Sequence, residues 1–66
     1  ALDRARLIGV FEIGGERRAL VRMPNGKVRR LARKDRLGDW TVSIIGRDAV
    51  RLTRNGEARS LLLVGR

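Results

Sequence analysis

The chain has 66 residues, enough for one small domain, and it contains neither cysteine nor histidine. That composition excludes disulfide bonds, thiolate or imidazole metal ligands, and the usual nucleophile–base pairs of enzymes. Sixteen Lys and Arg residues against seven Asp and Glu residues give a net charge of +9, which favours an anionic partner: nucleic acid, lipid heads or an acidic protein surface. No apolar run approaches the roughly 20 residues that a membrane-spanning helix needs.

Turn residues recur about every ten residues along the chain, a spacing typical of short strands in a sandwich or barrel. The clearest turn signals are Gly14-Gly15, Pro24-Asn25-Gly26, Gly46-Arg47-Asp48 and Asn55-Gly56. Asn-Gly is the strongest of them, because both residues tolerate the positive φ of a type I′ hairpin turn. We therefore predict six strands, at residues 7–13, 17–23, 27–32, 40–45, 49–53 and 57–64.

Apolar and polar residues alternate within several of these ranges, as in half-buried antiparallel strands. In the range 40–45 the alternation places Trp40, Val42 and Ile44 on the core side. Residues 33–39 are too polar for a strand, and we predict a loop with at most one helical turn that crosses between sheets, with Leu37 packed on the core. The predicted fold is all-β: one domain (residues 1–66), a small six-stranded antiparallel sandwich or partly open barrel made of two three-stranded sheets.

The sequence shows no set of residues suited to catalysis. The carboxylates are scattered; Asp35 and Asp39 are the closest candidates, in the crossover loop, and aspartates in such a loop are typical turn formers beside arginines. Gly14-Gly15 lacks the strand–glycine–helix setting of a phosphate-binding loop. We therefore predict no catalytic residues, no metal, no cofactor and no enzymatic activity.

Binding is better supported, through either of two surfaces. Alternation places basic side chains on the outside of the predicted sheets, namely Arg18, Arg22, Arg29, Arg51 and Arg59. The only aromatic residues are Phe11 and Trp40, both predicted to be core, so a base-stacking platform for nucleic acid is missing. The first strand, 7–13, has little charge and includes Gly9, which predicts an edge at which a partner protein adds a strand.

A series of strand and turn patterns follows in a fixed order along residues 7–64. They are Leu7-Ile8-Gly9-Val10, the strand at 18–22, the turn at 24–28, Leu37-Gly38-Asp39, the hairpin at 40–57, and Leu61-Leu62-Leu63. In these features the chain resembles the periplasmic homology-region domain of the inner-membrane coupling protein of type II secretion systems, and the related domain of the type IV pilus assembly lipoprotein. It departs from that family at residues 34–37, where the family usually has glycine-aspartate before the apolar residue.

The resemblance implies a non-enzymatic protein–protein adaptor that links an inner-membrane platform to the outer-membrane secretin. The domain would then lie in the periplasm, with an inner-membrane anchor upstream of residue 1. In that family the first strand and its neighbours contact the partner, which maps here to Ile8, Val10 and Glu12, with Arg18 and Arg22 as charge partners. The residues also leave open an alternative, a small basic SH3-like or oligonucleotide-binding-like β-barrel that binds nucleic acid in the cytoplasm through arginines.

Overall fold

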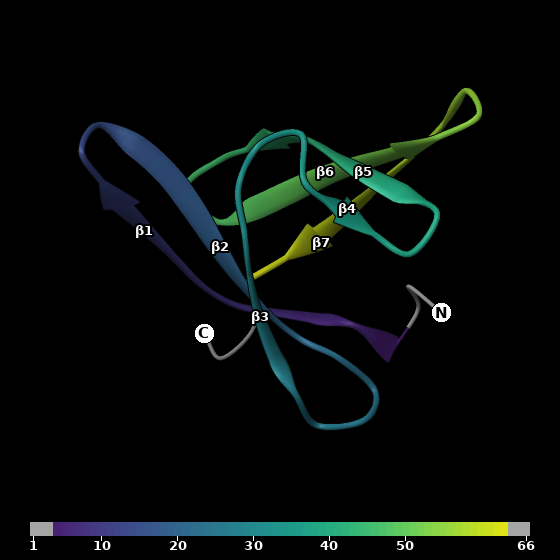
Figure 1. Cartoon of the computed structure of the whole chain (residues 1–66), viewed down its shortest axis with the longest axis horizontal. Coiled ribbons are helices and arrows are strands. Elements are labelled where there is room, and N and C mark those ends of the chain that lie inside the picture. Colours follow the sequence, from purple (N-terminus) through teal and green to yellow (C-terminus); the bar gives the residue numbers. More distant parts are fainter. Residues whose placement is uncertain (1–3, 64–66) are drawn as a thin grey trace.

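The computed structural model describes residues 4–63, and these residues form two antiparallel sheets. In chain order the strands are β1 (Arg6–Ile13), β2 (Glu16–Arg22), β3 (Val28–Leu31), β4 (Arg36–Leu37), β5 (Trp40–Ile45), β6 (Ala49–Arg54) and β7 (Glu57–Leu62). One sheet has the order β1-β2-β3 and the other β4-β5-β6-β7, and the two lie in separate layers (Figure 1). The predicted all-β sandwich of antiparallel sheets is confirmed. Both ends of the predicted domain, and Val64 of the predicted last strand, lie outside the described residues.

The second sheet has one strand more than predicted, because β4 lies in the segment expected to be a loop with a helical turn. Backbone hydrogen bonds tie this crossover to β5: Lys34 N–H donates to the Val42 carbonyl and Val42 N–H to the Asp35 carbonyl, both at 2.8 Å. Asp35 also accepts a hydrogen bond from Ala32 N–H at 2.9 Å, so it forms a turn, as predicted. Leu37 is buried on the core, also as predicted.

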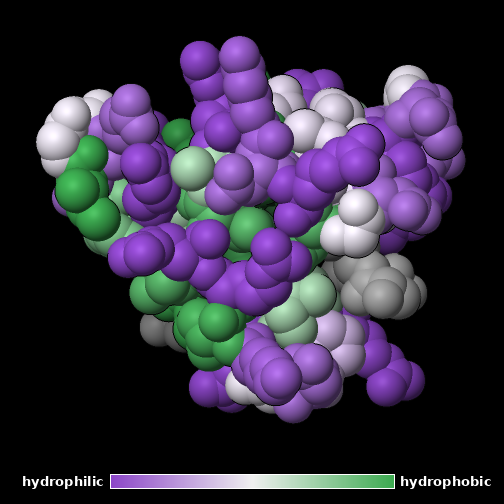
Figure 2. Space-filling model, viewed as in Figure 1, coloured by the Kyte–Doolittle hydropathy of each residue, from purple (hydrophilic) through white to green (hydrophobic). Residues whose placement is uncertain are grey.

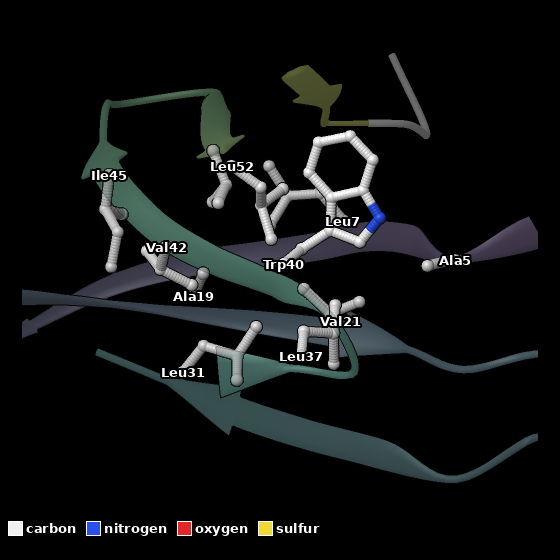
Figure 3. Packing of buried hydrophobic residues seen from close by; sticks show 11 residues of the cluster. Ala5, Leu7, Ala19, Val21, Leu31, Leu37, Trp40, Val42, Ile45 and Leu52 are labelled. Carbon is white, nitrogen blue, oxygen red and sulfur yellow. The ribbon is translucent and has the colours of Figure 1, made fainter. Parts of the chain in front are cut away.

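The core fills the space between the two sheets and receives side chains from both (Figure 3). The first sheet and the chain before it contribute Ala5, Leu7, Ala19, Val21 and Leu31, and the second contributes Leu37, Trp40, Val42, Ile45, Val50 and Leu52. Among the described residues, no polar or charged residue is buried with them. The apolar faces identified from alternation therefore meet in one core, as expected of two packed sheets.

Two β-bulges change which side chains point inward. In β5 the register shifts between Val42 and Ile44, so Ile45 is buried and Ile44 is 56% exposed. The prediction that Ile44 faces the core is therefore wrong, because a bulge inserts one residue and reverses the alternation after it. In β1 the register shifts between Leu7 and Gly9 in the same way.

The two Asn-Gly pairs form different turns. Asn55 and Gly56 have φ of 46° and 84°, as the predicted type I′ turn between β6 and β7 requires. At the other pair only Gly26 has a positive φ, and the loop is closed by a hydrogen bond from Gly26 N–H to the Met23 carbonyl. The type I′ prediction is wrong there, because a longer loop joins β2 to β3. Between residues 4 and 63 there is no helix of the length and hydrophobicity needed to cross a membrane.

Candidate functional site

The first strand is an edge of its sheet, as predicted. β1 pairs with β2 on one side, and on the other side its one neighbour in the described part of the chain is Leu63, through a single parallel bridge to Leu7. Among residues 4–63, therefore, residues 9–13 of β1 have a strand neighbour on one side only, β2. We call this stretch the β1 edge. Edges of this kind present unpaired backbone N–H and C=O groups to a partner.

The other edge strands are better protected by length or charge. β3, the opposite edge of the same sheet, has arginines at two of its four positions, Arg29 and Arg30. β4 has only two residues, and β7 has the charged residues Glu57 and Arg59. The β1 edge reads Gly-Val-Phe-Glu-Ile and has one charge in five residues. Natural sheet proteins block edge pairing with charged side chains, so β1 is the least protected edge.

The structure does not bring the five predicted partner-binding residues onto one face. Ile8 lies at the bulge and is 38% exposed, whereas Val10 is half-buried and packs against the core. Glu12 is exposed and lies opposite Arg17 rather than beside Ile8. Arg18 is half-buried and paired with a neighbouring carboxylate, and Arg22 lies at the far end of β2. The bulge separates Ile8 from Val10, because it reverses the alternation between Leu7 and Val10. Val10 and Glu12 pair with Ala19 and Arg17, and so lie on the face opposite to Arg18 and Arg22.

Phe11 belongs to the outer face of the first sheet and not to the core cluster, contrary to prediction. Directly paired residues share a face of a sheet, and Phe11 pairs with Arg18 while Gly9 pairs with Leu20. A Cβ added to Gly9 would lie 3.6 Å from Leu20 Cδ1, so the Leu20 side chain covers the glycine. The half-buried Phe11 and Leu20, with the 52%-exposed Ile13, border the β1 edge on its outer side.

Hydrophilic residues cover most of the face shown in Figure 2, and hydrophobic residues reach this surface in several places: in the centre, in the lower part, and on the left of the view, at the end of the β1–β2 hairpin. This distribution agrees with the exposure of Ile13, the last residue of β1. The apolar side chains next to the β1 edge are therefore accessible on a predominantly polar, basic molecule.

A first hollow of about 550 Å³ lies between the β1–β2 hairpin and the crossover to β4; we call it the hairpin hollow. Its lining includes four cationic residues (Arg17, Arg18, Arg33 and Lys34) and two carboxylates (Glu12 and Glu16). Two of the cations are already engaged: Arg17 donates to the Ile45 carbonyl at 3.2 Å, and Arg18 pairs with Glu16 at 3.1 Å. The positive charge of the hairpin hollow is therefore partly neutralised by carboxylates in its own lining.

A second hollow, also of about 550 Å³, lies where β1 begins and β2 ends; we call it the arginine hollow. Its lining consists of Arg4, Arg6, Arg22, Met23, Pro24 and Gly26. None of the carboxylates in residues 4–63 contributes to this lining. The alternation of residues predicted Arg22 on the outside of its sheet, but it did not predict that Arg4 and Arg6 lie beside it. That proximity depends on the β1–β2 register, in which Arg6 pairs with Arg22.

Trp40 is a core residue covered by arginines, and it is not available as a stacking platform. It is 6% exposed, as predicted, and the guanidinium carbon of Arg54 lies 4.5 Å from its ring centroid. Arg59 approaches the same ring at 5.9 Å. Cation–π contacts of this kind hold the arginines over the indole and shield it from a ligand.

Comparison of the chain with models of known protein families, with curated proteins and with solved structures finds no match. The candidate site therefore stands on its own geometry: an unprotected sheet edge with apolar neighbours at one end of β1, and a group of arginines at the other.

Proposed function

We propose that this chain is a non-enzymatic protein-binding domain that accepts a strand from its partner at the β1 edge. The main observation behind the proposal is that, within the described part of the chain, residues 9–13 have a strand neighbour on one side only and a single charge, Glu12. A partner strand would form hydrogen bonds with the free backbone groups, which supplies affinity. Pockets for alternate side chains supply specificity, and the exposed Ile13 and half-buried Phe11 border the edge for that purpose.

The resemblance to the secretion and pilus domains supports a particular partner, a periplasmic domain of the outer-membrane secretin. On this proposal the chain is an adaptor between the secretin and an inner-membrane platform, and it works in the periplasm as part of a protein anchored to the inner membrane. The net charge of +9 favours a partner whose surface is acidic around the added strand.

The test is to place a charge on the β1 edge without disturbing the core. Ile13→Lys adds a cation at an exposed position of β1, and charge at an edge opposes strand addition. The matched control is Ile44→Lys, the same change at a 56%-exposed position on β5, an inner strand of the other sheet. Affinity for the secretin's periplasmic domains is measured by calorimetry, and amide hydrogen exchange in the complex identifies the backbone that becomes protected.

We expect Ile13→Lys to weaken binding by about tenfold or more, while Ile44→Lys leaves it within about twofold, as for a residue outside an interface. Amides of residues 9–13 should gain protection in the complex. Equal losses in the two variants, or protection confined to another strand, would refute strand addition at β1. Absence of binding to any secretin domain would refute the choice of partner.

The alternative, a nucleic-acid-binding module, is favoured by one observation, the excess of exposed arginines. Neither aromatic residue is fully accessible for base stacking, because Trp40 is buried and Phe11 is half-buried. Under this alternative, duplex DNA or RNA would bind without sequence preference, and the affinity would fall steeply as salt is added. A sequence-specific complex that survives physiological salt would displace the adaptor proposal.

A further inference from the structure

The arginine hollow brings three cationic side chains together with no carboxylate of residues 4–63 in its lining. Its three arginines make no hydrogen bond or ion pair with any other residue of 4–63, whereas the hairpin hollow holds two carboxylates beside its cations. We propose that the arginine hollow, formed by Arg4, Arg6 and Arg22, is a binding site for a phosphate group.

The register of the first sheet supports this assignment. Arg6 and Arg22 are direct cross-strand partners, and like charges in that position destabilise a sheet. The other two direct pairs of charged residues among the described strands are of opposite sign, Glu12 with Arg17 and Glu57 with Arg54. The pair in the arginine hollow is therefore the exception, and a bound anion would remove the repulsion.

The identity of the residues points to the same conclusion. Each guanidinium group presents several N–H donors in a fixed planar arrangement and has no acceptor, so two opposed arginines cannot hydrogen-bond to each other. An anion with several oxygens can accept hydrogen bonds from both, and the planar fork of arginine matches phosphate oxygens in a bidentate arrangement. Arg4 adds a third donor group on the same hollow.

The neighbouring turn restricts which groups can take part. Met23 N–H donates to the Lys27 carbonyl at 2.7 Å, and Gly26 N–H donates to the Met23 carbonyl at 2.8 Å. Lys27 N–H is bound to the Asn25 side chain at 3.0 Å. These backbone donors are already satisfied, so recognition falls to the arginine side chains. Two sources present the same phosphate chemistry, a soluble phosphate compound and the headgroup of an anionic phospholipid.

The test compares two double variants that lose the same charge. Arg6→Gln with Arg22→Gln removes the opposed pair, and Arg47→Gln with Arg51→Gln removes two exposed arginines of the other sheet and its turn. Each protein is titrated with inorganic phosphate against chloride at constant ionic strength, and backbone amide and arginine Nε–H resonances are followed by NMR. Co-sedimentation with vesicles of phosphatidylglycerol in phosphatidylcholine, and of phosphatidylcholine alone, forms the second arm.

We expect saturable shifts around Arg4, Arg6, Arg22 and Gly26, reduced about tenfold or more in affinity by the first double variant and little by the second. Vesicle binding that depends on phosphatidylglycerol and is lost with the same pair assigns the site to a lipid headgroup; a phosphate response without vesicle binding assigns it to a soluble phosphate compound. Shifts spread over all the arginines, or equal losses in both double variants, would overturn the site. The result is separable from strand addition, because the arginine hollow and the β1 edge lie at opposite ends of β1.

Discussion

Lys34 is held in a backbone conformation that favours glycine, and this makes its substitution a quantitative test of the fold. Its φ is 77°, in the left-handed region, and its N–H is fixed by the hydrogen bond to Val42 that attaches the crossover to β5. An L-residue in this region costs about 1–2 kcal/mol relative to the right-handed form. Glycine avoids that cost but loses about 0.5–1 kcal/mol more than alanine through backbone entropy on folding.

Lys34→Gly is therefore expected to raise the free energy of unfolding by about 0.5–1 kcal/mol, the difference between these two effects. In a domain of this size that corresponds to an increase in Tm of roughly 2–8 °C. The side chain makes no hydrogen bond or ion pair with the other described residues, so little else is lost. Urea denaturation followed by circular dichroism gives the free energy, and a thermal scan gives the Tm.

The matched control is Asn55→Gly, at the other non-glycine residue with positive φ in the described chain. Asparagine tolerates the left-handed region far better than lysine, so we expect this change to leave stability unchanged or slightly lower. If Lys34→Gly lowered the free energy of unfolding instead of raising it, the backbone at position 34 would not be strained. The crossover would then have a different conformation in solution.

Three further substitutions test the core, the register and the cover of the indole. Leu31→Ala, at a fully buried position, should lower the free energy of unfolding by about 2–5 kcal/mol, whereas Leu62→Ala, 68% exposed, should change it little in the same denaturation assay. Arg22→Thr should stabilise the domain by about 0.2–1 kcal/mol at low salt by removing the like-charge pair, and a gain that persists in high salt would contradict that origin. Arg54→Ala should cost about 0.5–1 kcal/mol through the lost contacts with Trp40 and Glu57, and it should shift the Trp40 fluorescence to longer wavelength. An unchanged spectrum would show that the guanidinium does not shield the ring.

The strands could be predicted because most of the information is local. Turn residues marked the ends of the long strands to within one or two residues, and alternation identified Ala19, Val21, Val50 and Leu52 as core. The short strand β4 could not be found in this way. Two residues are too few to show a period, and β4 exists because Leu37 and Trp40 pair across the turn at Gly38.

The faces of two strands were harder to predict than their positions. Both β1 and β5 contain a bulge, and each bulge places residues of the wrong parity on the core side, which explains why Ile44 is exposed and Phe11 lies outside the core cluster. In β1 nearly every residue around the bulge is apolar, and in β5 the bulge is followed by two isoleucines, Ile44 and Ile45, so the sequence does not indicate where the alternation reverses. The arrangement of the candidate site depends on that reversal. The sequence could therefore predict which residues belong to the first strand, but not which of them share a face.

The parallel bridge between Leu7 and Leu63 has a consequence for how the chain folds. Each sheet is made from one continuous stretch of chain, so its hairpins can form early from neighbouring residues. The bridge joins residues from opposite ends of the chain, and closing such a large loop carries the greatest entropic cost. We expect that contact to form late and to open first, which would expose more of the β1 backbone in brief local openings than the inner strands expose. An edge that loosens before the rest of the sheet can exchange one neighbouring strand for another without global unfolding.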